Sequence, residues 1–322
     1  MSSPAISIVV PTFNSARAVD RCLEALVNQR IRAHEIIVVD GGSNDKTVEL
    51  AEGYSGVRVI KNRRSHFPGS SRNLGAQASS GNIVLFLDSD CKADNMLVAY
   101  HQSAYSTIRG LAGVQGILRA SNQGEMSKVI ESQFLTQYWL ENLRRDGTVK
   151  FHSAAVSNLS LRRSTFLNNK FTEGLVSCDD VELFIKLRRN KAKVLFEPRA
   201  VAYHPHPENI RLLFQQRKWY GQGFVHLRRQ YPRFRFRKNS MFDTSLRYLR
   251  ASFNALMFML YEDHSALCEG CTLRKCRVRD RRVRAKRRFD AQYLRQITCL
   301  GFAAGVLKTR FGVDYDWKPL AE

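Results

Sequence analysis

Long apolar runs are missing from this sequence. No stretch of about 18 consecutive apolar residues occurs in the 322 residues, so we expect no transmembrane helix. The first residues, "MSSPAISIVVPTFN", have no basic segment ahead of the apolar one, which predicts a strand and a turn and not a secretory leader. Only seven cysteines are present, an odd count. Together with the missing leader, this count favours a reducing, cytoplasmic compartment over a disulfide framework.

Two phosphate-binding fingerprints are also missing. No "GxGxxG" follows the first apolar run, which argues against a Rossmann dinucleotide site. No "GxxxxGK[ST]" occurs either, so a P-loop is excluded. A nucleotide, if one binds, must therefore be held by a different set of residues.

Acidic residues are scarce relative to basic ones. Lys and Arg number 51 against 29 Asp and Glu, a formal net charge of +22. The excess is uneven, because the segment from Arg228 to Arg295 alone holds 19 basic and 6 acidic residues. We therefore predict a catalytic domain over residues 1–230 and a basic, helical region over residues 231–322 that binds an anionic partner.

What the chain does contain is a set of apolar, β-branched runs in its first third. They read "ISIVVP", "EIIVVD", "VRVIKN" and "NIVLFLD", and helical patterns such as "ARAVDRCLEALVNQ", "SNDKTVELAEGY" and "SSRNLGAQASS" lie between them. Near-continuous hydrophobicity is typical of strands that are covered on both faces. The alternation predicts an α/β fold with a mostly parallel sheet flanked by helices.

Polar residues stand where three of these strands end. Carboxyl ends of parallel strands meet at one edge of an open sheet, which is where such sheets bind ligands. We therefore expect one crevice lined by these residues, and solvated loops are the alternative interpretation. The residues are Pro11, Thr12 and Asn14 after the first strand, Asp40 after the second, and Asp88, Ser89 and Asp90 after the fourth.

The chemistry of these residues suits a nucleoside diphosphate. Two acids at one strand end, Asp88 and Asp90, are suited to a hard divalent cation that also binds phosphate oxygens. Arg72, in "GSSRNLG", could bind the diphosphate, although a surface ion pair is the plainer alternative. Asp40 could accept hydrogen bonds from a base or a ribose. The sequence thus predicts a nucleotide-diphosphate site bridged by a metal ion.

Several separated motifs, in order over roughly the first 225 residues, resemble the inverting family 2 glycosyltransferases of the GT-A fold. "SIVVPTFN" resembles the first strand and nucleotide loop of that family, and "IIVVDGGSNDKT" resembles its second strand. The family often has a second Asp after the first, where this chain has Gly41. "PGSSRNLGAQASSGNIVLFLDSD" resembles the segment with the Arg and the Asp-x-Asp signature, and "SNLSLRRSTF" resembles the acceptor side. "FTEGLVSCDDVELFIKLRRNKAKVLFEPRAVAYH" and "RKWYGQG" continue the resemblance.

The resemblance implies a GT-A type domain that moves a sugar from a nucleotide-diphospho-sugar to an acceptor hydroxyl with inversion. It implies that Asp180 is the general base and that Asp90, Asp88 and His204 lie at a Mn²⁺ or Mg²⁺ ion. It further implies nucleotide contacts from the loop and strand-end residues. These are Pro11, Thr12, Phe13, Asn14, Asp40, Arg72, Asp88 and Ser89. The acceptor implied by family habit is a glycan or a lipid-linked glycan, in surface polysaccharide or glycolipid biosynthesis.

Plainer interpretations of the same residues remain open. Asp179 and Asp180 could both serve the start of a helix, where acids are favoured. We expect this role for Asp179 and the catalytic role for Asp180. His204 could be an ordinary loop histidine, with His206 as a second, weaker candidate.

The basic region raises two further hypotheses. "SLRYLRASFNALMFMLY" and "LRQITCLGFAAGVLKTRFG" could lie on an anionic membrane surface at the inner face of the membrane, with ten basic residues between them in 274–288. Nucleic acid is the less favoured partner, and an RNA-binding protein or a nucleotidyltransferase is the alternative function. The spacing of "HSALCEGCTLRKC" also allows a Zn²⁺ site, and the alternative interpretation is three unpaired thiols. Its ligands would be His264, Cys268, Cys271 and Cys276.

Overall fold

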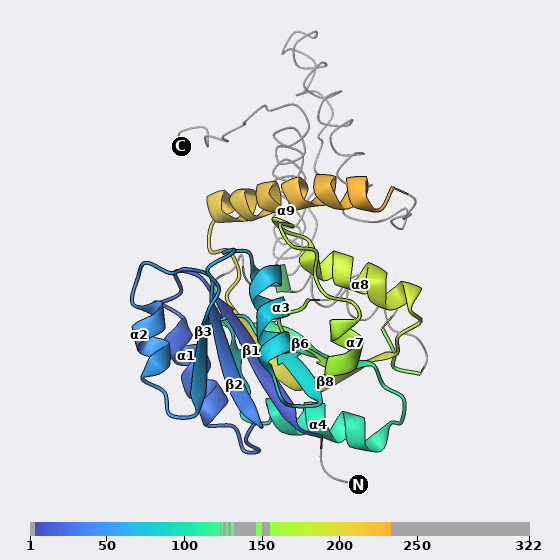
Figure 1. The fold of residues 1–322 in the computed structure, drawn as a ribbon. Helices are drawn as coiled ribbons and strands as arrows, with labels where there is room; N and C mark the ends of the chain where they lie inside the picture. Colours follow the sequence, from blue (N-terminus) through green and yellow to red (C-terminus); the bar gives the residue numbers. More distant parts are fainter. Residues whose placement is uncertain are drawn as a thin grey trace, which may run out of the picture. The chain divides into compact units, whose positions relative to one another are not determined.

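The structure is a computed structural model of the whole chain, and it describes residues 4–122, 124, 127, 130–131, 146–149 and 155–232. The chain divides into two compact units, Met1–His206 and Pro207–Glu322. The first unit contains an eight-stranded sheet with helices on both faces (Figure 1). Within the second unit, the structure describes residues 207–232, which include one long helix.

The strands of the sheet lie in the order β3-β2-β1-β4-β7-β6-β8-β5. β1 pairs in parallel with β2 and β4, and β2 pairs in parallel with β3. β7 runs antiparallel to both β4 and β6, whereas β6 and β8 are parallel. The mostly parallel sheet predicted from sequence is therefore confirmed. The strands are β1 Ile6–Thr12, β2 Glu35–Asp40, β3 Val57–Lys61, β4 Ile83–Phe86, β5 Lys92–Ala93, β6 Gly113–Ala120, β7 Leu159–Arg162 and β8 Val194–His204.

The helices form a layer on each face of the sheet. Buried residues of α1, α2 and α4 pack against one face, and buried residues of α3, α7 and α8 pack against the other. The second unit contributes α9. The helices are α1 Val19–Val27, α2 Thr47–Glu52, α3 Pro68–Ala78, α4 Leu97–Thr107, α7 Arg163–Leu167, α8 Asp179–Arg189 and α9 Ile210–Gln230.

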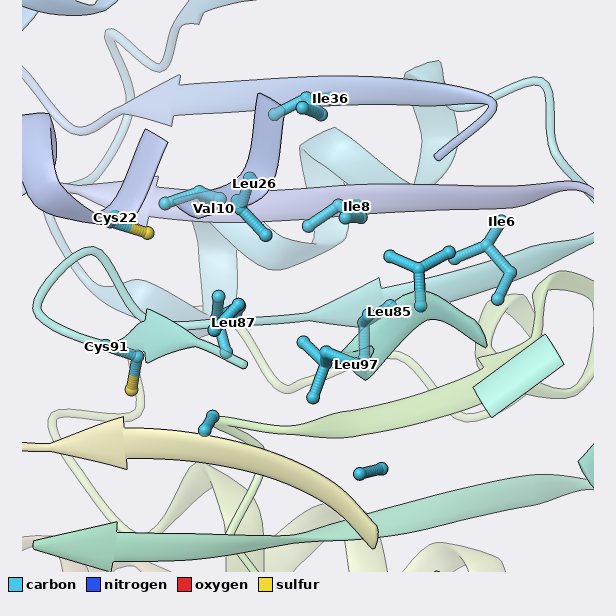
Figure 2. Packing of buried hydrophobic residues seen from close by; sticks show 14 of the residues in the cluster. Ile6, Ile8, Val10, Cys22, Leu26, Ile36, Leu85, Leu87, Cys91 and Leu97 are labelled. Carbon is cyan, nitrogen blue, oxygen red and sulfur yellow. The ribbon is translucent and has the colours of Figure 1, made fainter. Parts of the chain in front are cut away.

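Alternation along β1 explains why its sequence is apolar throughout. Ile8 and Val10 belong to one core cluster, and Val9, which lies between them, belongs to the other. Successive side chains of a strand point to opposite faces, so a strand that is covered on both faces needs apolar residues at every position. Figure 2 shows the first cluster, in which Ile8 and Leu85 lie among the other buried side chains.

Three details differ from the sequence prediction. β3 is the edge strand and is only partly buried, so it is not covered on both faces. Ser43 was predicted to begin a helix, but α2 begins at Thr47 and the Ser43 hydroxyl donates to Asp40 instead. The resemblance of "RKWYGQG" also implies a helix followed by a turn at its glycines, and this turn is wrong, because Gly221 and Gly223 lie inside α9, which continues to Gln230.

The predictions for the far C-terminal region lie outside the described residues. This applies to the Zn²⁺ cluster His264, Cys268, Cys271 and Cys276 and to the two surface helices. Among the residues that are described, no helix has the length and apolar character that a membrane crossing requires. The predicted boundary between residues 230 and 231 stays a prediction.

Candidate active site

The strand ends bring the predicted acids to one edge of the sheet. β4 ends at Phe86, and the ladder to β1 continues through the N–H of Leu87, which donates to the Val9 carbonyl at 3.2 Å. Asp88 and Asp90 follow immediately. β8 ends at His204, so its imidazole reaches the same edge from the other half of the sheet.

Asp88 has a hydrogen-bond partner for each carboxylate oxygen. Its Oδ1 accepts from Arg72 Nη2 at 2.5 Å, and its Oδ2 accepts from the hydroxyl of Ser157. Burial alone raises the pKa of Asp88, but the charge and hydrogen bond of Arg72 and the hydroxyl of Ser157 outweigh it. They hold the pKa below its usual range, so Asp88 is ionised.

Asp90 is in the opposite situation although it lies only two residues away. Its Oδ1 is buried and has no hydrogen-bond partner among the described residues, and its Oδ2 is 3.5 Å from His204 Nε2. Burial raises the pKa of Asp90, His204 partly counteracts this, and the Asp88 charge adds to the rise. A buried carboxylate oxygen without a donor lacks positive charge, which a cation could supply.

The residues around Asp90 fit a divalent cation. One ligand atom from each of Asp90, Cys91 and His204 lies within 4.8 Å of the others. Carboxylate oxygen is an ordinary ligand of Mn²⁺ and Mg²⁺, and imidazole nitrogen is an ordinary ligand of transition metals, so the pair fits Mn²⁺ better than Mg²⁺. The unpartnered Oδ1 of Asp90 is the observation that favours a cation here over a simple ion pair with His204.

Arg72 joins the strand end to the start of α8. Its side chain is buried, its Nη2 donates to Asp88, and its Nη1 donates to Asp179 Oδ2 at 2.5 Å. The guanidinium also lies over the ring of Phe171, 5.8 Å from the centroid. Arg72 is thus shared between two carboxylates, and its predicted contact with a diphosphate stays a prediction.

α8 presents two acids in its first turn with different surroundings. The helix begins after Cys178, whose φ of 65° is left-handed and whose side chain accepts no capping hydrogen bond. Asp179 is therefore more than the helix-start acid we expected, because it pairs with Arg72. Asp180 Oδ1 accepts the N–H of Val181 at 2.7 Å, which is the one hydrogen bond of this carboxylate among the described residues. Burial, and then the charge of Asp179, raise the pKa of Asp180 to about 7.

Glu182 fixes α8 against the loop that precedes it. It is fully buried, and its carboxylate accepts from the N–H of Thr172 at 2.9 Å and from the Thr172 hydroxyl. Lys186, one turn later, lies 3.1 Å from the same carboxylate. These contacts hold the first turn of the helix, and with it the acids, in a defined place.

The predicted nucleotide loop is tied to the segment after β2 through Asp40. Asp40 is 2% exposed, and its oxygens accept from Thr12 Oγ1 at 3.2 Å, from Ser43 Oγ at 2.5 Å, and from the N–H groups of Gly42 and Ser43. The Ser43 hydroxyl oxygen in turn accepts the N–H of Asn14 at 2.8 Å. Asp40 therefore shapes this loop, and its predicted contact with a base stays a prediction.

His66 lies where sequence reasoning placed no functional residue. A Cβ at Gly41 would be 2.9 Å from the Cα of His66, so no side chain fits at position 41 without a backbone shift. The imidazole of His66 lies 5.3 Å from the ring of Phe13, which is 45% exposed. The absence of a second Asp at position 41 is thus explained by the close approach of the segment around His66.

The remaining predicted residues are placed as follows. Ser89 donates to Ser15 Oγ at 2.9 Å, which links the acid cluster to the nucleotide loop. His206 lies 6.0 Å from His204 between ring centroids, and its ring does not belong to the metal cluster found among the described residues. Ser157, which the sequence reasoning did not single out, is the first residue of the quoted "SNLSLRRSTF" motif.

The mixed sheet with helices on both faces and acids at its strand ends defines a GT-A type fold. Comparisons with solved structures agree with this fold. The mannosyltransferase PcManGT from Pyrobaculum calidifontis, solved with GDP-Man and Mn²⁺, matches with a TM-score of 0.68 at 14% identity, over 97% of this chain and 88% of that one. Glucosyl-3-phosphoglycerate synthase from Mycobacterium tuberculosis, solved with Mn²⁺ and UDP, matches with a TM-score of 0.52 at 21% identity, over 70% and 79% of the two chains.

Residues 7–165, just under half of the chain, match the family described as Glycosyl transferase family 2. Glycosyltransferase AglE from Haloferax volcanii is 32% identical over 113 residues, which are 33% of this chain and 36% of that protein. Probable glycosyltransferase YdaM from Bacillus subtilis is 24% identical over 231 residues, which are 68% and 55% of the two. The chain thus spans about half or less of these curated relatives.

Proposed function

We propose that the protein is a metal-dependent, inverting glycosyltransferase that moves a sugar from a nucleotide-diphospho-sugar to an acceptor hydroxyl. The observation that carries this proposal is a pair of acids, each close in sequence to one of the two carboxylates that Arg72 binds, Asp88 and Asp179. Asp90 has an unpartnered buried oxygen beside His204, and Asp180 has a pKa raised to about 7. The first suits a cation that binds a diphosphate, and the second suits a base that works near neutral pH.

The family match favours this activity over the two alternatives that the sequence left open. A nucleotidyltransferase on a similar sheet would leave the Asp180 carboxyl without a role. An RNA-binding protein would not require a carboxyl whose pKa is raised to about 7 inside the crevice. Neither alternative explains the acids at the start of α8.

In this mechanism, Asp90 and His204 would hold a divalent cation, which would supply positive charge for the departing nucleoside diphosphate. Asp180 accepts the proton of the acceptor hydroxyl while that oxygen forms a bond to the anomeric carbon. The bond from the anomeric carbon to the diphosphate oxygen breaks at the same time, so the diphosphate leaves with the electron pair and the configuration inverts. Arg72 orients Asp88 and Asp179 on the two sides of the reaction centre.

The donor and acceptor are proposed as classes. The similar structures were solved with GDP-Man, UDP-Glc and UDP-GlcNAc, which supports a nucleotide-diphospho-sugar and leaves the base open. A relative that is 38% identical over 92 residues is named poly(ribitol-phosphate) beta-glucosyltransferase. Its name supports an acceptor of the surface-glycan or lipid-linked kind.

A thermal-shift screen of the full chain with nucleoside diphosphates tests the metal and the donor together. We expect UDP or GDP to raise the melting temperature with Mn²⁺ and to do so far less with EDTA, because ligands stabilise only the state they bind. Release of the same nucleoside diphosphate from its sugar conjugate, dependent on Asp180, then tests transfer. Equal stabilisation with and without metal would contradict the proposed cation site.

We also propose that the basic C-terminal region binds an anionic membrane surface at the cytoplasmic side. The support is the charge of the segment from Arg274 to Arg288, which has ten basic residues and one acidic residue. Co-sedimentation with vesicles that contain anionic lipid should fall when salt rises, since such attraction is screened within about 10 Å at 0.1 M. Tighter, salt-sensitive binding to RNA than to these vesicles would overturn the choice of partner.

A further inference from the structure

A buried polar cluster lies between α4 and the sheet, and the proposed chemistry does not use it. His101 of α4 and Ser160 of β7 are both fully buried, and so is Asn158, which directly precedes β7. His101 Nδ1 is 2.8 Å from Ser160 Oγ, and His101 Nε2 is 2.9 Å from Asn158 Oδ1. Buried polar groups with this many partners specify one arrangement of the chain around them.

The direction of each hydrogen bond follows from the partners of Asn158. Its Nδ2 donates to the carbonyls of Ile117 and Ala200, each at 2.9 Å. Its Oδ1 must therefore face His101 and accept the Nε2–H, which leaves His101 Nδ1 to accept the hydroxyl proton of Ser160. Burial lowers the pKa of His101 to about 4, so the ring is neutral at physiological pH.

The backbone of Asn158 has a conformation that residues other than glycine seldom adopt. Its φ is 128°, in the left-handed region, which costs on the order of 1–3 kcal/mol for a residue with a Cβ. Its N–H donates to the Phe86 carbonyl at 3.0 Å, and its carbonyl accepts the Gly116 N–H at 2.9 Å. A Cβ at Gly116 would lie only 2.3 Å from Asn158 Nδ2. Glycine at position 116 of β6 therefore provides the space that the Asn158 side chain occupies.

These bonds connect Asn158 to the two strands that lead to the acid-histidine pair. Through Phe86 it is bonded to β4, which leads to Asp88 and Asp90. Through Ala200 it is bonded to β8, which ends at His204. The residue before it, Ser157, donates its hydroxyl proton to Asp88.

We propose that Asn158, held by His101, is a positioning residue that sets the separation of Asp90 from His204 and the orientation of Asp88. The inference rests on the proposed function in one respect, which is that Asp90 and His204 bind a divalent cation. The main-chain N–H of Asn158 bonds to Phe86 of β4, and its side-chain amide bonds to β6 and β8. β4 and β8 are not neighbours in the sheet, since β7 and β6 lie between them, so Asn158 ties together strands that the sheet joins only through two others. Asn158→Gly keeps the main-chain bond to β4 and removes the side-chain bonds to β6 and β8.

The test replaces Asn158 with glycine in the full chain. Glycine adopts a φ of 128° without strain, so Asn158→Gly removes the side-chain bridge and relieves the backbone at the same time. The probe is Mn²⁺, alone and with UDP or GDP, and free Mn²⁺ is counted by electron paramagnetic resonance. We expect Mn²⁺ affinity to fall by roughly 10-fold, the lower end of the effect of losing an outer-shell partner of a metal ligand, because Asn158 bonds to the strands and to neither proposed ligand directly.

Gln29→Ala is the matched control. Gln29 is also a buried amide with three main-chain hydrogen bonds, two donated to the carbonyls of Ala25 and Asp94 and one accepted from Val98. It bridges no residue of β4 and β8, so the control should lose stability and keep Mn²⁺ affinity within about two-fold. If Asn158→Gly does not fold, His101→Leu removes the donor to Asn158 Oδ1 and the acceptor of the Ser160 hydroxyl, keeps the bonds from Asn158 to Ile117 and Ala200, and should weaken Mn²⁺ binding by a smaller factor.

The outcomes separate this inference from the proposed function. If the wild-type protein binds Mn²⁺ and Asn158→Gly binds it equally well, the positioning role is overturned and the metal site stands. Equal weakening in Gln29→Ala would also overturn it, because general loss of stability would then explain the effect. If the wild-type protein binds no Mn²⁺ with or without nucleotide, the proposed metal site fails, and the inference fails with it. A His101 ring in the Nδ1–H tautomer, read from its ¹³C shifts, would contradict the hydrogen-bond assignment independently.

Discussion

Asp180→Asn should make the metal-free protein more stable and the enzyme inactive. The side chain keeps its shape and can still accept the N–H of Val181 through Oδ1. What it loses is a charge whose burial, next to Asp179, raises the pKa of the wild-type carboxyl from 3.8 to about 7. A group that is costly to ionise in the folded protein destabilises that protein whenever the pH forces ionisation.

The size and the pH window follow from that shift. A pKa displaced by about three units corresponds to at most ~4 kcal/mol of lost stability, at 1.36 kcal/mol per unit. Asp180 is only half-buried, so water screens part of this and we expect ~2 kcal/mol. The folded state binds the proton more tightly than the unfolded state, so the wild type loses stability as pH rises from 3.8 to about 7 and no further above it. The advantage of Asp180→Asn should therefore be near zero at pH 4 and complete at pH 8.

Thermal unfolding with EDTA at pH 4 and pH 8 measures this directly. For a unit of about 200 residues, ~2 kcal/mol corresponds to a rise in melting temperature of roughly 4–8 °C at pH 8. Asp179→Asn is the matched control, because it removes the partner of buried Arg72 and should lower the melting temperature instead. If Asp180→Asn melts at the wild-type temperature at pH 8, the carboxyl is not strained by its surroundings, and the argument for a base tuned to neutral pH fails.

Further predictions concern turnover, the metal site, the nucleotide loop and α8. Wild-type turnover should rise with pH through about 7, and Asp180→Asn should lower it by roughly 10²-fold or more with unchanged nucleotide affinity; a flat pH profile would argue against this base. Asp90→Ala should abolish the Mn²⁺ dependence of UDP or GDP binding in calorimetry, and unchanged dependence would move the cation elsewhere. Gly41→Ala should cost about 1–3 kcal/mol in urea unfolding and weaken nucleotide binding, because its Cβ would meet the His66 backbone at 2.9 Å; a neutral effect would mean that the segment yields freely. Glu182→Ala should cost about 3–5 kcal/mol, since Lys186 and the Thr172 amide lose a buried partner, and a loss below 1 kcal/mol would show that α8 is anchored elsewhere.

The sheet was predictable because its signal is local and strong. The apolar runs around Ile8, Ile37 and Leu85 are buried on both faces of the sheet, so their hydrophobicity has no gaps. The burial predicted for the strand from Val57 to Lys61 was too high, since the sequence does not show that this strand lies at an edge of the sheet. The stripe of α1 was also predictable, because Cys22, Leu23 and Leu26 recur at helical spacing and are buried.

Side-chain partners were much less predictable, since they depend on contacts between distant residues. Arg72 and Asp179 are 107 positions apart, and no sequence pattern indicated that they would pair. Ser157 is 69 positions from Asp88, which it contacts. His66 gave no signal at all, because its approach to Gly41 depends on the path of the segment before α3. Residue types at strand ends thus predicted which acids meet at this edge of the sheet, and only the structure shows how charge is divided among them.

The division of charge at Asp88 and Asp90 shows how an apolar strand can end in two acids. The two residues are of one type and share one strand end, yet their pKa values move in opposite directions. Arg72 and Ser157 together supply a donor to each oxygen of Asp88, so that acid is stabilised by the protein itself. Asp90 has His204 beside Oδ2, and its buried Oδ1 has no hydrogen-bond partner among the described residues, although the side chain as a whole is 41% exposed. A cation beside Asp90 would supply the positive charge that this oxygen lacks, so under the proposed function Asp90 is the acid that depends on the metal.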